Sequence, residues 1–175
     1  MAANPSDRAR FSIFRFADAK TLEESGVVIP DSEEKSPVDP TGGALWGISD
    51  TGSQALVLYA TPEMSIVHLW FKSGFRLPRH RHDADCLYYV VAGTLQIGQE
   101  RLSAGDGFFV GGNVPYAYTA GDEGVEVIEF RATGKFTTDL MADQAFWNKA
   151  GEAMRGKQEG WRNETVELSR ASVSQ

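Results

Sequence analysis

Residues 74–93 read GFRLPRHRHDADCLYYVVAG and hold two of the three histidines of the chain. His80 and His82 are separated by one residue, and an apolar, aromatic run follows them. Side chains alternate along a strand, so two histidines at positions i and i+2 point to the same face. On the inner face of a barrel they could chelate one ion, whereas in a loop they would be an ordinary surface pair. We favour the inward pair.

Short apolar runs of strand length surround this segment. They are separated by turn-forming Gly, Asp, Asn and Pro residues, which fits a chain with 18 Gly and 7 Pro. Closely spaced short strands are typical of a sandwich or a barrel. The expected strands lie at 55–60, 64–71, 87–91, 94–97, 107–110, 116–119 and 125–130.

The segment 74–93 resembles the first sequence motif of the cupin family. That motif contains a Gly, a His-x-His pair, a Glu and a second Gly. Gly74, His80, His82 and Gly93 stand at the matching positions, whereas Cys86 stands where the motif has Glu.

The second cupin motif follows at the matching distance, with Gly105 and Asp106 in place. Its Pro, Gly and His positions are held by Gly111, Asn113 and Tyr116. The resemblance covers about residues 46–132.

The resemblance implies an all-β fold, a cupin (double-stranded β-helix or jelly-roll) barrel, over residues 46–132. Residues 1–45 are expected to form an N-terminal extension, with a short strand at 11–16 and a polar loop at 31–40. Residues 133–175 are expected to form a C-terminal helix, from 144 to about 157, and a loose tail. Trp147, Ala150 and Met154 fall on one face of that helix.

The resemblance also implies a divalent metal (Fe, Mn, Ni, Cu or Zn), because typical cupins bind one with three His and one Glu. His80 and His82 are the retained ligands. Cys86 is a candidate third ligand as a soft thiolate, or else a small buried residue with an inert thiol. Tyr116 is either a metal ligand or a hydrogen-bonding residue of the pocket.

His68 is the remaining histidine, and the direction of its side chain is open. If Ile66, His68 and Trp70 face inward, His68 completes a three-histidine site. If Val67, Leu69 and Phe71 do so, it lies outside. Both alternating sets are apolar enough to be buried.

Tyr88 lies two residues after Cys86 and is expected on the same inward face. Some cupin lyases, including dimethylsulfoniopropionate lyases, use a Tyr placed like this as a general base, so the resemblance implies Tyr88 and Tyr116 as catalytic residues. The alternative for Tyr88 is an aromatic ring that fills the barrel. Trp70, Arg76 and Tyr118 are the candidate substrate-binding residues. Arg76 could reach the barrel mouth and pair with a carboxylate, and the alternative for it is an ordinary solvated arginine.

Composition excludes other classes of protein. The formal charge of −7, with no basic cluster, disfavours nucleic-acid binding. We expect no membrane partner and no signal peptide, because no apolar run is long enough. With Cys86 as the single cysteine, no intramolecular disulfide forms, and we expect a cytoplasmic protein.

The expected function is that of a metal-dependent cupin enzyme acting on a small organic substrate. The reaction would be non-haem oxygenase-like (a dioxygenase, an oxidoreductase) or lyase- or isomerase-like. The alternative is a metal-free cupin that binds a small ligand without catalysis. A third hypothesis is a structural barrel whose main role is dimerisation. A homodimer is expected in each case.

Overall fold

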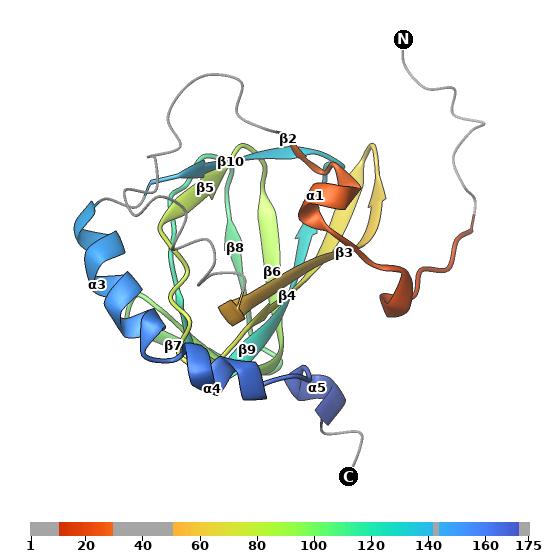
Figure 1. Ribbon diagram of the computed structural model, residues 1–175. Coiled ribbons are helices and arrows are strands. Elements are labelled where there is room, and N and C mark those ends of the chain that lie inside the picture. The colour runs from red at the N-terminus through yellow and green to blue at the C-terminus, as the bar shows by residue number, and fades with distance from the viewer. Residues whose placement is uncertain (1–10, 30–50, 142–143, 172–175) are drawn as a thin grey trace.

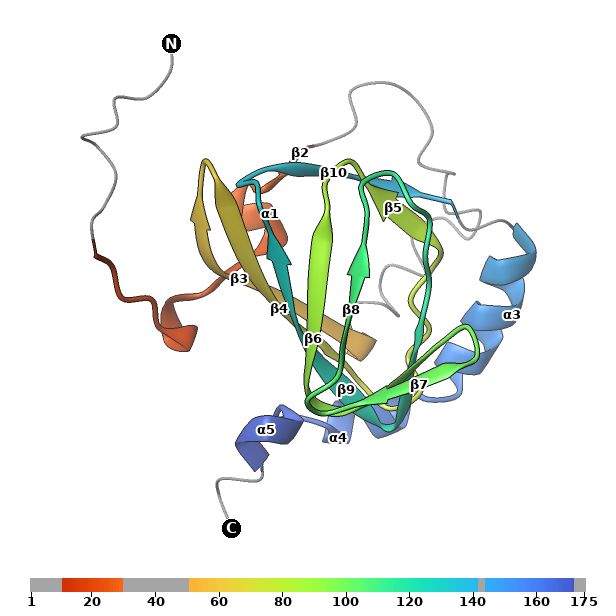
Figure 2. The ribbon, with the colours of Figure 1, turned by 180° about the vertical axis from the view of Figure 1, so that it is seen from behind.

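The structure is a computed structural model that describes residues 11–29, 51–141 and 144–171. Strands wrap around a shared interior, and helices run along one side and across the lower end (Figures 1 and 2). The strands are β1 (Lys20–Thr21), β2 (Val28–Ile29), β3 (Ser53–Thr61), β4 (Met64–Phe71), β5 (His80–His82), β6 (Cys86–Ile97), β7 (Glu100–Ser103), β8 (Gly107–Val110), β9 (Thr119–Arg131) and β10 (Phe136–Leu140). The helices are α1 (Leu22–Ser25), α3 (Gln144–Arg155), α4 (Gln158–Asn163) and α5 (Leu168–Ala171), with a 3-10 turn at Phe16–Asp18.

Two sheets form the barrel. The larger has the strand order β1-β3-β4-β9-β6-β7, and β8 pairs with the other part of β6. The smaller has the order β2-β10-β5, and only its β2–β10 pair is parallel among the described pairs. Isolated bridges join Arg76 to Thr119 and His80 to Tyr116, so β5 and its approach lie against the segment that leads into β9.

The register of the large sheet determines which side chains face the interior. Val67 of β4 pairs with Glu129 of β9, which in turn pairs with Tyr88 of β6. Directly paired residues of antiparallel strands share a face. Val67 and Val90 are fully buried, so the odd-numbered residues of β4 and the even-numbered residues of β6 from Cys86 to Val90 point inward.

The C-terminal helices complete the core. Trp161 of α4 is 0% exposed, and its indole Nε1 donates to the Ser73 carbonyl at 2.9 Å. Its ring lies 5.8 Å from that of Phe75, inside the barrel end. The helix predicted over 144–157 is confirmed by α3, whose Ala150 and Met154 are buried.

Several local predictions differ from the structure. Residues 11–15 form an exposed coil and no strand, because their apolar side chains find no sheet edge; the nearby strand is β1. The expected turn at Gly93 is a bulge inside the continuous strand β6. The tail is ordered at α5, where the Ser169 backbone N–H donates to Glu126 at 2.7 Å. The polar loop predicted at 31–40 lies outside the described residues.

Candidate functional site

Strand β5 presents its two histidines to the barrel interior. His80 is 7% exposed and His82 is 8% exposed. Arg81 between them points outward and pairs with Asp139 of β10 at 2.8 Å. The inward direction predicted from the i, i+2 spacing is therefore what the structure shows.

Main-chain carbonyls fix the tautomer of both imidazoles. His80 Nδ1 lies 2.8 Å from the Pro78 oxygen, and His82 Nδ1 lies 3.0 Å from the Thr137 oxygen. A carbonyl only accepts, so each Nδ1 carries the hydrogen. Burial lowers the pKa of His80, and burial together with the charges of Arg131 and His80 lowers that of His82 to about 3. Both rings are neutral and direct an Nε2 lone pair inward.

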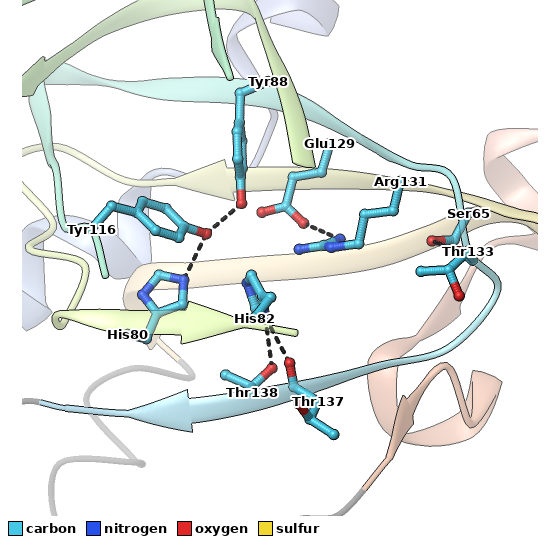
Figure 3. A network of polar contacts seen from close by, with 10 residues as sticks. All are labelled: Ser65, His80, His82, Tyr88, Tyr116, Glu129, Arg131, Thr133, Thr137 and Thr138. Atoms are coloured by element: carbon cyan, nitrogen blue, oxygen red, sulfur yellow. Dashed lines mark hydrogen bonds and ion pairs between the residues drawn. The ribbon is translucent and has the colours of Figure 1, made fainter. Parts of the chain in front are cut away.

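A chain of hydrogen bonds of fixed direction ends on His80 (Figure 3). The Tyr116 hydroxyl lies 2.8 Å from His80 Nε2, which has a lone pair, so Tyr116 donates. Its oxygen then accepts from the Tyr88 hydroxyl. Burial raises the pKa of both phenols, so both keep their protons. The order of donation is Tyr88 to Tyr116 to His80.

Strand β9 adds a buried ion pair that the sequence analysis missed. Arg131 Nη1 lies 2.7 Å from Glu129 Oε2, and the Arg131 side chain is 1% exposed. The guanidinium carbon lies 3.8 Å from the ring centre of Phe136. Figure 3 shows both side chains entering the interior from β9, on the side opposite β5. The available signal was the pair of charges two residues apart in the apolar run 125–131.

Cys86 faces the same interior but remains a thiol. It is 1% exposed and pairs with Arg131 across β6 and β9. Burial, and after it the charge of Glu129, raises the pKa of Cys86 to about 12. In this environment the side chain is a neutral thiol, as the alternative of a small buried residue predicts.

The interior does not supply the ligands of a typical cupin metal site. Among the described residues, no group of three or more His, Cys, Asp and Glu side chains is placed to hold a metal ion. The carboxylate of Glu129 forms an ion pair with Arg131, and His80 Nε2 accepts a hydrogen bond from the Tyr116 hydroxyl. His82 Nε2 is the donor that remains, and one or two imidazoles hold a metal weakly. The described residues therefore do not complete the ligand set of three His and one Glu that typical cupins have.

Two predicted site residues lie elsewhere. His68 contacts Glu126 at 3.4 Å and the ring of Phe16 on the outer face of β4. Trp70 lies two residues further along β4 and so faces the same side, where the Lys72 Nζ atom lies 5.1 Å from the centre of its ring. Because Val67, Leu69 and Phe71 are the inward set, His68 does not complete a three-histidine site and Trp70 does not line the interior.

The predicted substrate-binding residues differ in position. Tyr118 is buried beside Phe71 and Phe108, inside the barrel. Arg76 is partly exposed and bridges to Thr119. The buried cation that the structure describes in the interior is Arg131, whereas Arg76 lies on the partly exposed segment before β5.

The motif glycines have structural roles. Gly93 has a φ of 74° at the β6 bulge, and Gly105 has a φ of 96° in the turn before β8. Asp106 closes that turn by accepting from the Ser103 backbone N–H at 2.8 Å. The positive φ values of Gly93 and Gly105 explain why glycine stands at these two motif positions.

No family model matches the sequence, and no curated protein matches it. Solved structures do match. KdgF from Halomonas sp. is 29% identical, covers 46% of this chain and 79% of its own, and has a TM-score of 0.42. An RmlC-like cupin from Shewanella frigidimarina is 26% identical over 47% of this chain and 78% of its own, with a TM-score of 0.43. The chain has a cupin fold, which rests on the barrel and on the motif positions described above.

A third similar structure is the DMSP lyase DddQ from Ruegeria pomeroyi. It is 20% identical over 46% of this chain and 47% of its own, with a TM-score of 0.43. At such scores the likeness to these proteins does not extend to their activities. No helix among the described residues of this cupin is long and apolar enough to cross a membrane.

Proposed function

We propose that this cupin binds a small organic molecule in its barrel and catalyses proton transfer on it, in an isomerase- or lyase-type reaction. The observation that carries the proposal is the pair of neutral, inward imidazoles with different partners. His82 Nε2 accepts no hydrogen bond among the described residues, whereas a phenol already donates to His80 Nε2. The site thus offers a base and a proton donor side by side.

The buried polar groups of the site contribute little to the stability of the fold. Burial of the Glu129–Arg131 pair removes two charges from water, and an apolar pair of similar size would serve stability as well. The phenol chain adds further polar groups to the same interior. Buried, perturbed ionisable groups gathered in a barrel interior are typical of functional sites.

In the proposed mechanism, His82 Nε2 takes a proton from the bound molecule and becomes an imidazolium. Tyr116 turns its hydroxyl hydrogen from His80 to the oxygen of the substrate on which negative charge develops, and Tyr88 continues to donate to Tyr116. His82 then returns its proton, to a different carbon in an isomerisation or to the leaving group in an elimination. His82 and Tyr116, each 8% exposed, are more accessible than Tyr88, which is 1% exposed.

Hydrogen–deuterium exchange tests the proposal without a known substrate. The protein is incubated in D2O with a mixture of small carbonyl and hydroxy compounds, and NMR follows the loss of C–H signals. We expect enzyme-dependent exchange that His82→Asn abolishes and Tyr116→Phe reduces by about 100-fold, within the usual range for acid–base groups. His68→Asn, on the outer face, is the matched control and should exchange like the wild type.

Two other outcomes of this assay are informative. Binding of a compound without exchange in any of them would contradict catalysis and leave the sequence-based alternative, a cupin that binds a ligand without turning it over. Exchange that persists in His82→Asn would show that a residue other than His82 is the general base.

Metal-dependent catalysis, of dioxygenase or lyase type, is the second candidate. It is favoured by the carbonyl contacts of both Nδ1 atoms, because metal-binding histidines are oriented in this way. Metal analysis of untagged, chelator-free protein by mass spectrometry separates the candidates. About one ion per chain, lost in His82→Asn, would support the metal enzyme; no ion after anaerobic Fe(II) loading would support the acid–base site.

The homodimer and the cytoplasmic location stay predictions. The outer face of β6, β8 and β9 supports the homodimer, because it carries a group of exposed apolar side chains. Leu87 pairs with Phe109 and with Phe130, and Tyr89 lies beside them. Light scattering of the wild type and of Tyr89→Glu tests it, since a charge on this face should separate the subunits. A wild-type monomer would exclude the dimer.

A further inference from the structure

We propose that Arg131 is the anchor for a carboxylate group of the bound molecule. This inference rests on the proposed small-molecule site and names the class of its ligand. It concerns the guanidinium edge that the internal ion pair leaves unused.

The guanidinium of Arg131 has three sides with different surroundings. Phe136 packs on its face at 3.8 Å, and Glu129 lies 2.7 Å from Nη1. The buried Nε–H has no hydrogen-bond partner among the described residues. The neighbouring Ser65 donates its hydroxyl to the Thr133 carbonyl at 2.9 Å, and in Figure 3 it lies away from the guanidinium.

An unpaired, buried donor on a charged group requires an explanation. Folded proteins satisfy nearly all such groups, because a buried donor without a partner destabilises the fold. Tyr118 repeats the situation, because its hydroxyl is also buried without a partner among the described residues. Two unsatisfied donors within one barrel interior indicate that a ligand with acceptor atoms completes the site.

The chemistry of the free edge selects a carboxylate. A guanidinium presents its N–H groups as a planar fork, which matches the two oxygens of a carboxylate. The remaining polar groups of the interior, the phenols of Tyr88, Tyr116 and Tyr118 and the thiol of Cys86, are protonated and do not repel an anion. Glu129 alone opposes it, and that charge is neutralised by the ion pair.

The anchor would place the rest of the molecule at the proposed base. Figure 3 shows the guanidinium extending from β9 toward His82 on β5. The charge of Arg131 also contributes to the lowered pKa of His82, which agrees with this placement. A carboxylate held at Arg131 therefore directs the adjacent carbons of a small acid to His82 Nε2.

Binding measurements with matched probes test this inference. Calorimetry and ligand-detected NMR would compare acetate, malonate and benzoate with acetamide, malonamide and benzamide. The carboxylates should bind about 10- to 100-fold more tightly than their amides, the range expected for charge-assisted hydrogen bonds. Equal binding of acid and amide would overturn the proposal.

Variants locate the anchor. Arg131→Lys keeps the charge but loses Nε–H and should lose about 10-fold or more in carboxylate affinity, with little change for the amides. Glu129→Gln removes the competing carboxylate and should strengthen carboxylate binding, so the two variants move in opposite directions. Arg81→Lys, on the outward side of β5, is the matched control and should bind like the wild type. Loss of affinity in Arg81→Lys, or weaker binding in Glu129→Gln, would overturn the assignment.

The failure of this inference and that of the proposed function have different signatures. Carboxylate binding that needs Arg131, without deuterium exchange in any compound, would leave the anchor in place and refute catalysis. Exchange in neutral compounds, with no preference for carboxylates, would keep the catalytic proposal and refute the anchor.

Discussion

Protonation of His82 is expected to destabilise this fold as the pH falls below 6.5. The pKa of His82 is lowered from 6.5 to about 3 by burial and by the charges of Arg131 and His80. The folded protein therefore binds fewer protons than the unfolded chain between these pH values. The contribution of His82 to stability is complete above pH 6.5 and is lost as the pH falls toward 3.

The size of this effect follows from the two pKa values. Between pH 8 and pH 5 the loss is about 2 kcal/mol for His82 alone, and the slope approaches about 1.4 kcal/mol per pH unit. The variant His82→Asn isolates it, because asparagine does not titrate and its amide can still donate to the Thr137 carbonyl, as Nδ1–H does.

Urea unfolding of both proteins at several pH values provides the measurement. The free energy of unfolding of the wild type should fall relative to that of His82→Asn by about 2 kcal/mol between pH 8 and pH 5. The comparison removes the contributions of carboxylates and of other groups common to both. Parallel curves across this range would show that His82 titrates alike in the folded and unfolded chain, and would refute the buried, neutral imidazole.

Three further predictions concern single residues. Cys86 should not react with a thiol reagent at pH 8 in the native protein and should react fully in denaturant. The reason is that the side chain is buried and its environment raises the pKa of the thiol to about 12. Reaction in the native protein would contradict this prediction. Gly93→Ala should lower the free energy of unfolding in urea by about 2 kcal/mol or more, because it combines a φ of 74° with a clash against the Gly124 carbonyl. The control Gly98→Ala has only the strain of its φ of 57° and should lose less. Equal losses in the two variants would exclude the clash. Trp161→Ala should cost about 3–5 kcal/mol and Trp161→Phe clearly less, and a small effect of the alanine variant would show that α4 does not contribute to the core.

The sequence predicted the inward pair of histidines well because the information is local. The period of two along a strand places His80 and His82 together, and it places Tyr88 with Cys86. The same rule could not decide whether the His68 side chain faces the interior or the outside. Both faces of β4 are covered, the inner one by the core and the outer one at His68 by the ring of Phe16, so both alternating sets of residues are largely apolar.

The ion pair could not be predicted because its burial depends on the whole fold. Glu129 and Arg131 in an apolar strand are compatible with a solvent-exposed face, and only the pairing with Tyr88 and Cys86 turns them inward. The packing of α4 is also tertiary. The sequence shows an aromatic residue at Trp161, but nothing near it in sequence indicates that the end of the barrel is its partner.

The position of Trp161 in the barrel end also bears on how the protein folds during synthesis. The ten strands of the described ranges all precede this residue in the chain, so they leave the ribosome before the side chain that covers Phe75 does. A nascent chain that has released β10 but not α4 has its strands available and one end of its core open to water. Completion of the domain therefore waits until α4 has been synthesised, and chains that terminate before residue 161 expose an aromatic surface to chaperones and proteases.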